Sequence, residues 1–202
     1  MCRVKLLTLS ASVLLLSACG GGGGSDGGNI TPPSTGIFVD SPVVGLHYAT
    51  PSRSGTTNAL GEYEYLPGET VTFSIGGIVL GSTPAGPVVT PLSLVSGAAD
   101  ASDPVVTNIV RLLMTLDDDG DAGNGIVIST AMAEAAVGHT VDFAAADFAA
   151  DPGMSAFLPL LPGPPALVDA TAAQAHFSAT LATQSNWGTL AWGSGTWKSK
   201  TP

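Results

Sequence analysis

The first half of the chain, residues 36–94, alternates short apolar runs with polar and turn-forming residues. In the runs 62–65 (EYEY) and 71–75 (VTFSI), apolar side chains recur at every second position, as in a strand with one solvent-facing side. Gly and Pro separate these runs, and Val, Ile, Tyr, Phe and Thr are frequent within them. The pattern predicts several short antiparallel strands packed as a β-sandwich.

After Asp103 and Pro104 the period of the apolar positions changes. Apolar residues now recur at helical spacing, at Val105, Ile109, Leu112, Leu113 and Leu116. The spacing predicts a helix that buries one stripe of side chains and ends at the aspartates before Gly120. Residues 126–128 then form either a short strand or an extended return.

The segments that follow are less regular. Residues 129–137 and 143–150 are rich in Ala and predict two further helices. Residues 151–165 contain several prolines, which lack a backbone N–H and interrupt helices, so this segment is predicted to be mostly loop.

A last helix is predicted near the C-terminus. Thr171 and Gln174 have the spacing of a capping box, which would open a helix that runs to about Thr183. That helix is expected to bury Phe177 and Leu181.

The N-terminus has the parts of a secretory signal. A short basic segment (MCRVK) precedes an apolar run (LLTLSASVLLL) that is too short to span a bilayer. Leu16-Ser17-Ala18-Cys19 resembles the bacterial lipobox, in which the signal peptide is cut before a lipid-modified cysteine. The alternative is an ordinary secretory signal with an unmodified cysteine. We predict a lipoprotein signal peptide over 1–18 and lipidation of Cys19, where several acyl chains give stable anchoring.

Segment 19–35 consists of Cys19 and a linker, GGGGGSDGGNITPPST, that is rich in Gly and has no apolar periodicity. Position 20, directly after the cysteine, is Gly. In Gram-negative lipoproteins, an Asp at that place resembles a signal that retains the protein in the inner membrane. The expected location is therefore the cell outer membrane, lipid-anchored, on its periplasmic or its surface-exposed face.

Composition and charge narrow the classes of partner. Of 202 residues, 45% are apolar, enough for a core, and only 11% are charged, while 26 Gly and 15 Pro indicate many turns. Cleavage at the lipobox removes two basic residues, Arg3 and Lys5, so the net charge of −10 becomes −12. This excess of carboxylates argues against nucleic acid as a partner and favours cations. Cleavage also removes Cys2, so no disulfide is expected in the folded part.

The strand-rich segment resembles the prealbumin-like module found in carboxypeptidase regulatory domains and many bacterial surface proteins. The resemblance rests on residues 40–45 (DSPVVG), 55–58 (GTTN) and 61–65 (GEYEY), with Asn58 where such modules commonly carry Asp. It implies a prealbumin/Ig-like antiparallel β-sandwich. Because such modules serve as spacers, adhesins and enzyme appendages, the resemblance leaves the function open.

The predicted chain is thus of the α+β class. After the signal and linker, the β-sandwich module occupies 36–100, a small helical subdomain with an acidic loop occupies 101–184, and a Trp-rich tail occupies 185–202. This longer pattern, with TNIVRLLMTLDDDGDAGNGI and AAQAHFSATL after the strands, resembles a group of proteobacterial envelope lipoproteins over 36–184.

The acidic loop, TLDDDGDAGNGI at 115–126, is the first candidate site. Asp117, Asp119 and Asp121 occupy alternate positions like the first three ligands of an EF-hand, and calcium prefers such closely spaced carboxylates. The EF-hand template then fails, because its sixth and twelfth positions are Ala and Ile rather than Gly and Glu.

Two interpretations of this loop are left open. A looser calcium site would combine Asp117, Asp119, Asp121 and Asn124 with a backbone carbonyl and water, and would relieve the repulsion among carboxylates that follow a helix C-terminus. Alternatively, the loop is a solvated acidic turn in which each Asp accepts hydrogen bonds from nearby backbone N–H groups.

The tail is the second candidate site, because it contains all three tryptophans at intervals of five, Trp187, Trp192 and Trp197. Exposed indoles can stack on sugars, and Lys198 and Lys200 would suit an acidic glycan. The same stretch also fits a pair of strands around a Gly turn that covers an open end of the sandwich. Odd spacing places successive tryptophans on opposite faces of a strand, which favours the structural interpretation.

Recognised catalytic motifs are missing from the sequence. His47, His139 and His176 form neither HxxxH nor HExxH, so they are expected to be ordinary surface or core residues rather than zinc ligands. No GxSxG elbow occurs. Glu62 and Glu64 would share one strand face, which without a deep scaffold around them indicates a solvent-exposed face.

These observations predict an outer-membrane-anchored lipoprotein that acts as a non-catalytic, adhesion-like binding module, with calcium as a candidate stabilising cofactor. The expected partners are the membrane, through the lipid anchor, and an envelope protein or glycan, but not nucleic acid. The alternatives are an enzyme-associated or hydrolytic surface lipoprotein and a purely structural spacer.

Overall fold

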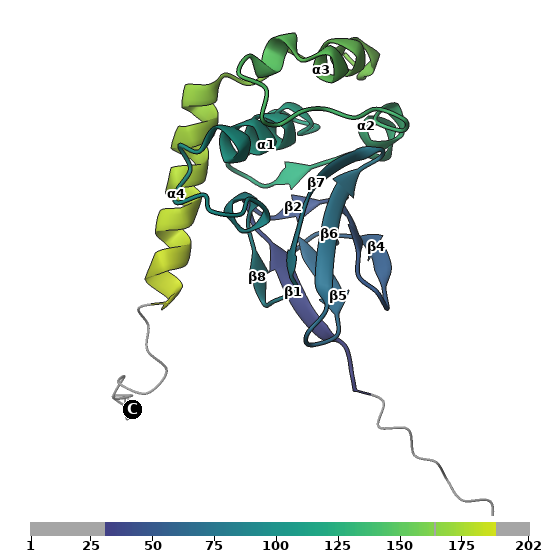
Figure 1. Cartoon of the computed structure of the whole chain (residues 1–202), viewed down its shortest axis with the longest axis vertical. Helices are drawn as coiled ribbons and strands as arrows, with labels where there is room; N and C mark the ends of the chain where they lie inside the picture. Colours follow the sequence, from purple (N-terminus) through teal and green to yellow (C-terminus); the bar gives the residue numbers. More distant parts are fainter. Residues whose placement is uncertain (1–30, 164, 189–202) are drawn as a thin grey trace, which may run out of the picture. The chain divides into compact units, whose positions relative to one another are not determined.

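Two small β-sheets make up most of the first half of the described chain (Figure 1). The computed structural model describes residues 31–163 and 165–188. The strands of these sheets are β1 (Ser34–Phe38), β3 (His47–Ala49), β4 (Ser54–Thr56), β5 (Glu62–Tyr65), β6 (Thr70–Ile75), β7 (Ile78–Pro84) and β8 (Val88–Val89). One sheet has the order β5-β1-β8, in which β1 is antiparallel to β5 and parallel to β8. The other is antiparallel throughout, in the order β4-β3-β6-β7.

A third, two-stranded pairing connects distant parts of the sequence. It joins β2 (Val43–Val44) in parallel to β9 (Ile126–Val127), the strand that follows the acidic loop. The Ile126 N–H donates to the Pro42 carbonyl at 3.0 Å, and the Ile128 N–H donates to the Val44 carbonyl at 3.0 Å. The acidic loop is therefore fastened to the turn that follows β1.

Aromatic side chains from both sheets meet in one core. Phe38 of β1 lies 4.7 Å from Phe73 of β6, and Tyr63 of β5 meets the same ring edge-on at 5.2 Å between ring centroids. In β6 the apolar residues at alternate positions are buried, as the period-two pattern predicts. The Tyr63 hydroxyl, which would be costly to bury alone, donates to the Gly86 carbonyl at 2.7 Å.

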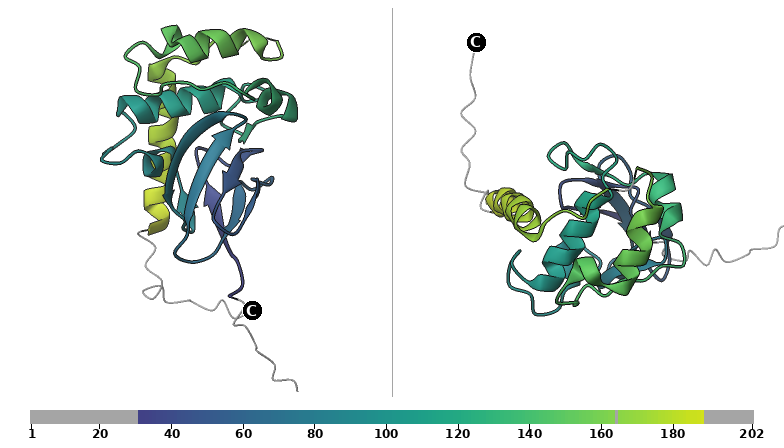
Figure 2. Two further views of the ribbon diagram at one scale, coloured as in Figure 1. Left: turned by 45° about the vertical axis from the view of Figure 1, so that its right-hand side comes forward. Right: turned by 90° about the horizontal axis from the view of Figure 1, so that it is seen from above.

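Helices cover one end and one side of the sheets (Figures 1 and 2). They are α1 (Pro104–Thr115), α2 (Thr130–Ala135), α3 (Pro152–Phe157) and α4 (Ala170–Gly188), with the short 3-10 turns η1 (Pro91–Leu94), η2 (Phe148–Ala150) and η3 (Leu158–Leu160). Within the described residues, no helix is both long enough and apolar enough to cross a membrane.

Helix α1 is central because it is buried on two faces. Asp103 caps its N-terminus by accepting hydrogen bonds from the backbone N–H groups of Val105 and Val106. Ile109, Leu112, Leu113 and Leu116 pack into the core that the sheets share, whereas Val106 and Val110 pack with Ala173 and Phe177 of α4 in a second, smaller core. The described residues from Thr31 onward form one compact unit.

The structure confirms the α+β class and several predicted elements. The helix expected from Val105 to Leu116 is α1, residues 126–128 contain strand β9, and Phe177 is fully buried. Leu181 is half-buried beside the second core.

Two predictions for the segment before α4 were wrong. Residues 143–150 form turns and the short η2 rather than a helix, because Asp142 and Asp147 bind backbone N–H groups nearby. Residues 151–165, predicted as mostly loop, contain α3 and η3. Asp151 caps α3 and Pro152 takes its first position, where a missing N–H costs nothing.

The start and end of the last helix were also predicted incorrectly. Asp169, and not Thr171, accepts the hydrogen bond from the Ala172 N–H, and Gln174 instead donates to the Thr107 hydroxyl on α1. Helix α4 continues to Gly188, beyond the expected end at Thr183, so it includes the first residues assigned to the tail.

The second core predicts a large stability cost for one substitution. Phe177→Ala removes a fully buried ring between α1 and α4 and should lower the free energy of unfolding by about 3–5 kcal/mol. Leu160→Ala, at a side chain that is 55% exposed, should change it by less than about 0.5 kcal/mol. Urea unfolding of residues 31–202 measures both, and equal effects would contradict this packing.

Candidate functional site

The acidic loop is folded by its own side chains. Asp119 accepts hydrogen bonds from the Asp121 N–H and, at 2.9 Å, from the Asn124 amide. Asp121 accepts one from the Gly123 N–H at 3.1 Å. These are the contacts that the interpretation as an acidic turn predicts.

Asp117 differs from its neighbours because it is only 6% exposed. One carboxylate oxygen accepts a hydrogen bond from the Val127 N–H at 2.9 Å, while the other has no hydrogen-bond partner among the described residues. Burial, and then repulsion from the Asp119 carboxylate, raise the pKa of Asp117, whereas the Asn124 amide lowers the pKa of Asp119.

The calcium site stays a prediction. Across 31–163 and 165–188, no three or more His, Cys, Asp or Glu side chains are grouped so that they could hold a metal. An ion at Asp117 and Asp119 would therefore take most of its ligands from backbone carbonyls, water and Asn124. The Asn124 side chain, whose NH2 group now donates to Asp119, would have to turn to offer its oxygen.

The other predicted binding residues fall largely outside the described part. Cys19, Trp192 and Trp197 lie in segments that the structure does not describe, and so does the expected strand pair. Trp187 belongs to α4 by its backbone, and its side chain lies outside the description.

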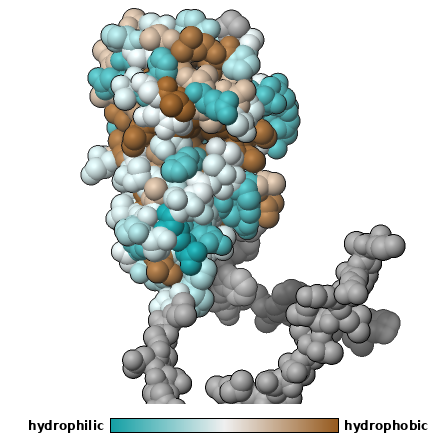
Figure 3. Space-filling view, turned by 90° about the vertical axis from the view of Figure 1, so that its right-hand side faces the viewer, coloured by the Kyte–Doolittle hydropathy of each residue, from teal (hydrophilic) through white to brown (hydrophobic). Residues whose placement is uncertain are grey.

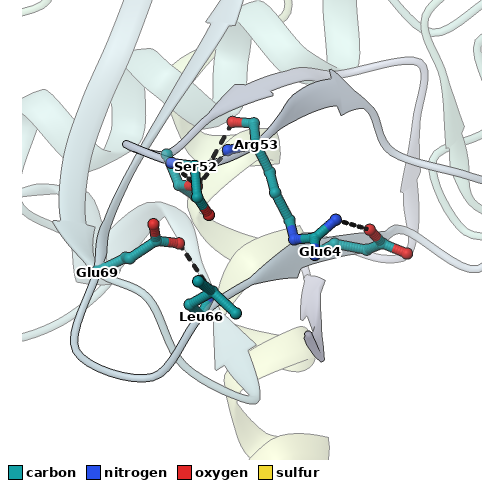
Figure 4. Close-up of polar contacts among 6 residues, drawn as sticks. Ser52, Arg53, Glu64, Leu66 and Glu69 are labelled. Atoms are coloured by element: carbon teal, nitrogen blue, oxygen red, sulfur yellow. Dashed lines mark hydrogen bonds and ion pairs between the residues drawn. The ribbon is translucent and has the colours of Figure 1, made fainter. Parts of the chain in front are cut away.

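Glu62 and Glu64 alternate along β5 with the buried Tyr63 and Tyr65, and Figure 4 shows Glu64 with its partner Arg53. Glu64 pairs with Arg53 at 3.1 Å, and Glu62 accepts a hydrogen bond from the Asn58 amide at 2.7 Å. Each carboxylate therefore has a local partner on the strand surface, as expected for a solvent-exposed face.

A buried pair that sequence reasoning missed joins α4 to the sheets. Asp40, which follows β1, is fully buried, and one of its carboxylate oxygens lies 3.3 Å from Nε2 of His176 on α4. Among the described residues, neither carboxylate oxygen of Asp40 nor Nε2 of His176 has a partner in hydrogen-bond geometry, so the two side chains meet as an ion pair. One signal was available: His176 directly precedes Phe177 and lies three residues after Ala173, so it is close to the face of α4 that packs on α1.

The turn that carries Asp40 is tightly constrained. Val39 and Pro42 form a bridge across it. Ser41 has a positive φ of +57°, and among the described residues it is the only non-glycine residue with a positive φ. This left-handed conformation costs an L-residue roughly 1–2 kcal/mol. The contact between Pro42 and Ile126 holds the turn against β9, so Asp40 is placed by both β1 and the acidic-loop segment.

The environment of the pair raises the pKa of both members. The nearby Asp40 carboxylate raises the pKa of His176 against the opposing effect of burial, and burial raises the pKa of Asp40. When His176 carries its proton and Asp40 does not, the imidazolium and the carboxylate attract each other in a site of low dielectric.

Beside this pair lies an open groove of about 630 Å³ between α4 and the β5-β1-β8 sheet. Its lining is mainly apolar on the sheet side and includes hydroxyl and amide groups on α4: Ile37, Val39, Ser41, Pro42, Leu60, Val88, Gly123, His176, Ala179, Thr180, Thr183 and Gln184. Leu60 is 62% exposed and Val88 is 47% exposed, although both are large apolar residues. We call this feature the α4 groove.

Comparisons with known proteins add no relative: no family model matches the chain, and neither the curated proteins nor the solved structures contain a match.

The buried pair predicts how stability depends on pH. A raised pKa in the folded state means that the folded protein holds its proton more tightly than the unfolded one, so the free energy of unfolding should fall as pH rises from 6.5 through the raised pKa of His176. His176→Gln leaves Asp40 buried without a cation and should cost about 3–5 kcal/mol at pH 6. The variant should regain much of this lost stability at acidic pH, where Asp40 becomes protonated.

Combining Asp40→Asn with His176→Gln should remove the decline above pH 6.5 at little cost in stability, because no buried charge remains. His47→Gln, at an exposed histidine, serves as the control. Urea unfolding of residues 31–202 between pH 4 and 9 measures these effects. A decline of the same size in the double variant would show that another group causes it.

The calcium prediction is tested by thermal melting. If the loop binds the ion, calcium at about 100 times its Kd should stabilise the folded state by about 2.7 kcal/mol and raise Tm. Asp119→Asn should abolish the rise, whereas Asp142→Asn, at an exposed turn elsewhere, should retain it. An unchanged Tm at millimolar calcium would leave the acidic turn as the account of this loop.

Proposed function

We propose that this protein is an outer-membrane lipoprotein, anchored through Cys19, whose prealbumin-like β-sandwich and helical subdomain form a non-catalytic binding module of the cell envelope. The observation that carries the proposal is the α4 groove, which leaves large apolar side chains open to solvent beside a rigid buried pair. Apolar surface gathered in one groove and left open to solvent is typical of sites that bind a ligand or a partner.

The groove's size and chemistry favour one class of partner. A volume of about 630 Å³ lies within the range of sites that hold a compact ligand or a few side chains. The sheet side of the groove offers Ile37, Leu60 and Val88, while Thr180 and Gln184 on α4 can bind polar backbone groups. We therefore propose an apolar segment of an envelope protein as the partner, in preference to a glycan.

A hydrolytic function is the second candidate. Ser41 and His176 both line the groove, and His176 pairs with Asp40, so the residue types of a catalytic triad are close together. However, within the described residues no hydrogen bond joins Ser41 to His176, and the histidine nitrogen that faces Asp40 is Nε2. The arrangement is explained more simply as a means of holding α4 in place.

The groove itself can be tested with an uncharged apolar fluorophore, N-phenyl-1-naphthylamine, added to residues 31–202. Binding should enhance its fluorescence, and Val88→Asp or Leu60→Asp should weaken binding by about tenfold or more, which equals ~1.4 kcal/mol. Val137→Asp, at an apolar side chain that is 67% exposed and does not line the groove, should have no effect.

Equal dye binding by the groove variants and the control would contradict the proposal. No dye binding at all would favour the alternative that the protein is a purely structural spacer. Reaction of Ser41 with a fluorophosphonate, lost in Ser41→Ala, would favour the hydrolytic alternative instead.

A further inference from the structure

We infer that the segment after α4, residues 189–202, docks into the α4 groove of its own molecule through Trp192 and Trp197. The inference rests on the proposed function, because the groove that would receive a partner's apolar segment would first be filled by the protein's own tail. The tail would then be an intramolecular competitor that a partner must displace. Four observations support it: the position of the groove, the reach of the segment, its apolar residues and its charge.

The groove lies next to the point where the described chain ends. Thr180, Thr183 and Gln184 line it from the last turns of α4, which ends at Gly188. With a rise of about 1.5 Å per residue, Thr183 lies only about 7–8 Å along the helix axis from Gly188. The segment that follows α4 therefore starts beside the open apolar surface.

The length of the segment is sufficient to cover the groove. Fourteen residues, 189–202, follow α4 in the sequence. Fully extended, they could span up to roughly 46–50 Å. A groove of about 630 Å³ requires only part of that length, so the chain can turn back and still place two tryptophans in it.

The segment's apolar residues suit the groove. It contains Leu190, Trp192 and Trp197, and an indole ring buries a large apolar area while its N–H can bond to a hydroxyl or an amide oxygen. The groove offers apolar side chains on the sheet side and the polar groups of Thr183 and Gln184 on the α4 side. Both parts of an indole would thus find a complementary surface.

Charge complementarity favours the same occupant. Between residues 31 and 188 the only Lys or Arg residues are Arg53, which pairs with Glu64, and Arg111, which donates to the Val168 carbonyl at 2.7 Å. The segment 189–202 carries Lys198 and Lys200 and no acidic residue.

The acidic loop reaches the groove through Gly123, and its Asp118, Asp119 and Asp121 are exposed. A cationic, tryptophan-containing segment is therefore attracted to this edge of the molecule. The opposite side, facing away from α4, shows a mixture of polar and apolar residues with the apolar ones more frequent toward the helical end (Figure 3).

Tryptophan fluorescence tests this inference directly, because every tryptophan of the chain lies at or after residue 187. In residues 31–202 carrying Trp187→Phe, the emission comes only from Trp192 and Trp197. Docking predicts emission shifted to the blue, and weaker quenching by acrylamide, relative to the same protein unfolded in urea. Val88→Asp and Leu60→Asp should each move both values toward those of the unfolded protein, and Val137→Asp should not.

Reversing the tail charge with Lys198→Glu and Lys200→Glu should shift the emission in the same direction, and the shift should be smaller. Circular dichroism and the Tm of each variant verify that it is folded. The inference would be overturned if the emission of the folded protein already matched that of the unfolded protein. It would also be overturned if the emission were the same in both groove variants as in the parent protein. A blue shift that disappears on dilution would assign the groove to a second copy's tail and would also overturn it.

The fluorophore experiment separates this inference from the proposed function. Trp192→Ser with Trp197→Ser should strengthen binding of N-phenyl-1-naphthylamine by removing the competitor. If dye binding depends on the groove but neither the tail variants nor the tryptophan emission respond, the proposed function stands and the tail inference is wrong. If the tryptophans dock but no dye enters even without them, the tail inference stands and the binding function is wrong.

Discussion

The attraction between Asp40 and His176 is the interaction on which the arrangement of α4 depends. The apolar contact between α1 and α4 brings Phe177 and Ala173 against Val106 and Val110, and apolar packing alone is non-directional. A fully buried carboxylate constrains its partner more strictly, because moving away from its cation would leave it uncompensated. The pair thus fixes the position of α4 beside the sheet, and the α4 groove exists because the helix is held there.

The same turn also explains what the acidic loop does in the fold. Asp40, Ser41 and Pro42 form a strained turn that is held by the strand following the loop, since Pro42 accepts a hydrogen bond from Ile126. The Asp117 carboxylate accepts a hydrogen bond from the Val127 N–H, which ties the start of the loop to that strand. With or without a bound calcium ion, the loop supports the turn that carries Asp40 and contributes Gly123 to the α4 groove.

The sequence predicts those elements whose residues interact locally. The period-two pattern of β6 and the helical stripe of α1 are visible in a few consecutive residues, and the structure has both. Segments such as 143–150 were predicted incorrectly because aspartates bind the nearby backbone N–H groups and compete with helix formation. The candidate site was missed because Asp40 and His176 are far apart in the sequence, and neither belongs to a motif whose spacing reveals the other. Only the fold brings them together.

Hydrogen–deuterium exchange of the α4 amides tests most directly whether the buried pair holds this helix in place. In residues 31–202 with Asp40→Asn, amides of 172–184 should lose protection at neutral pH, while those of α1 near Leu112 and Leu113, deep in the shared core, should keep it. Protection of α4 that is unchanged by this substitution would contradict the account, because the helix would then be held by its apolar contacts alone.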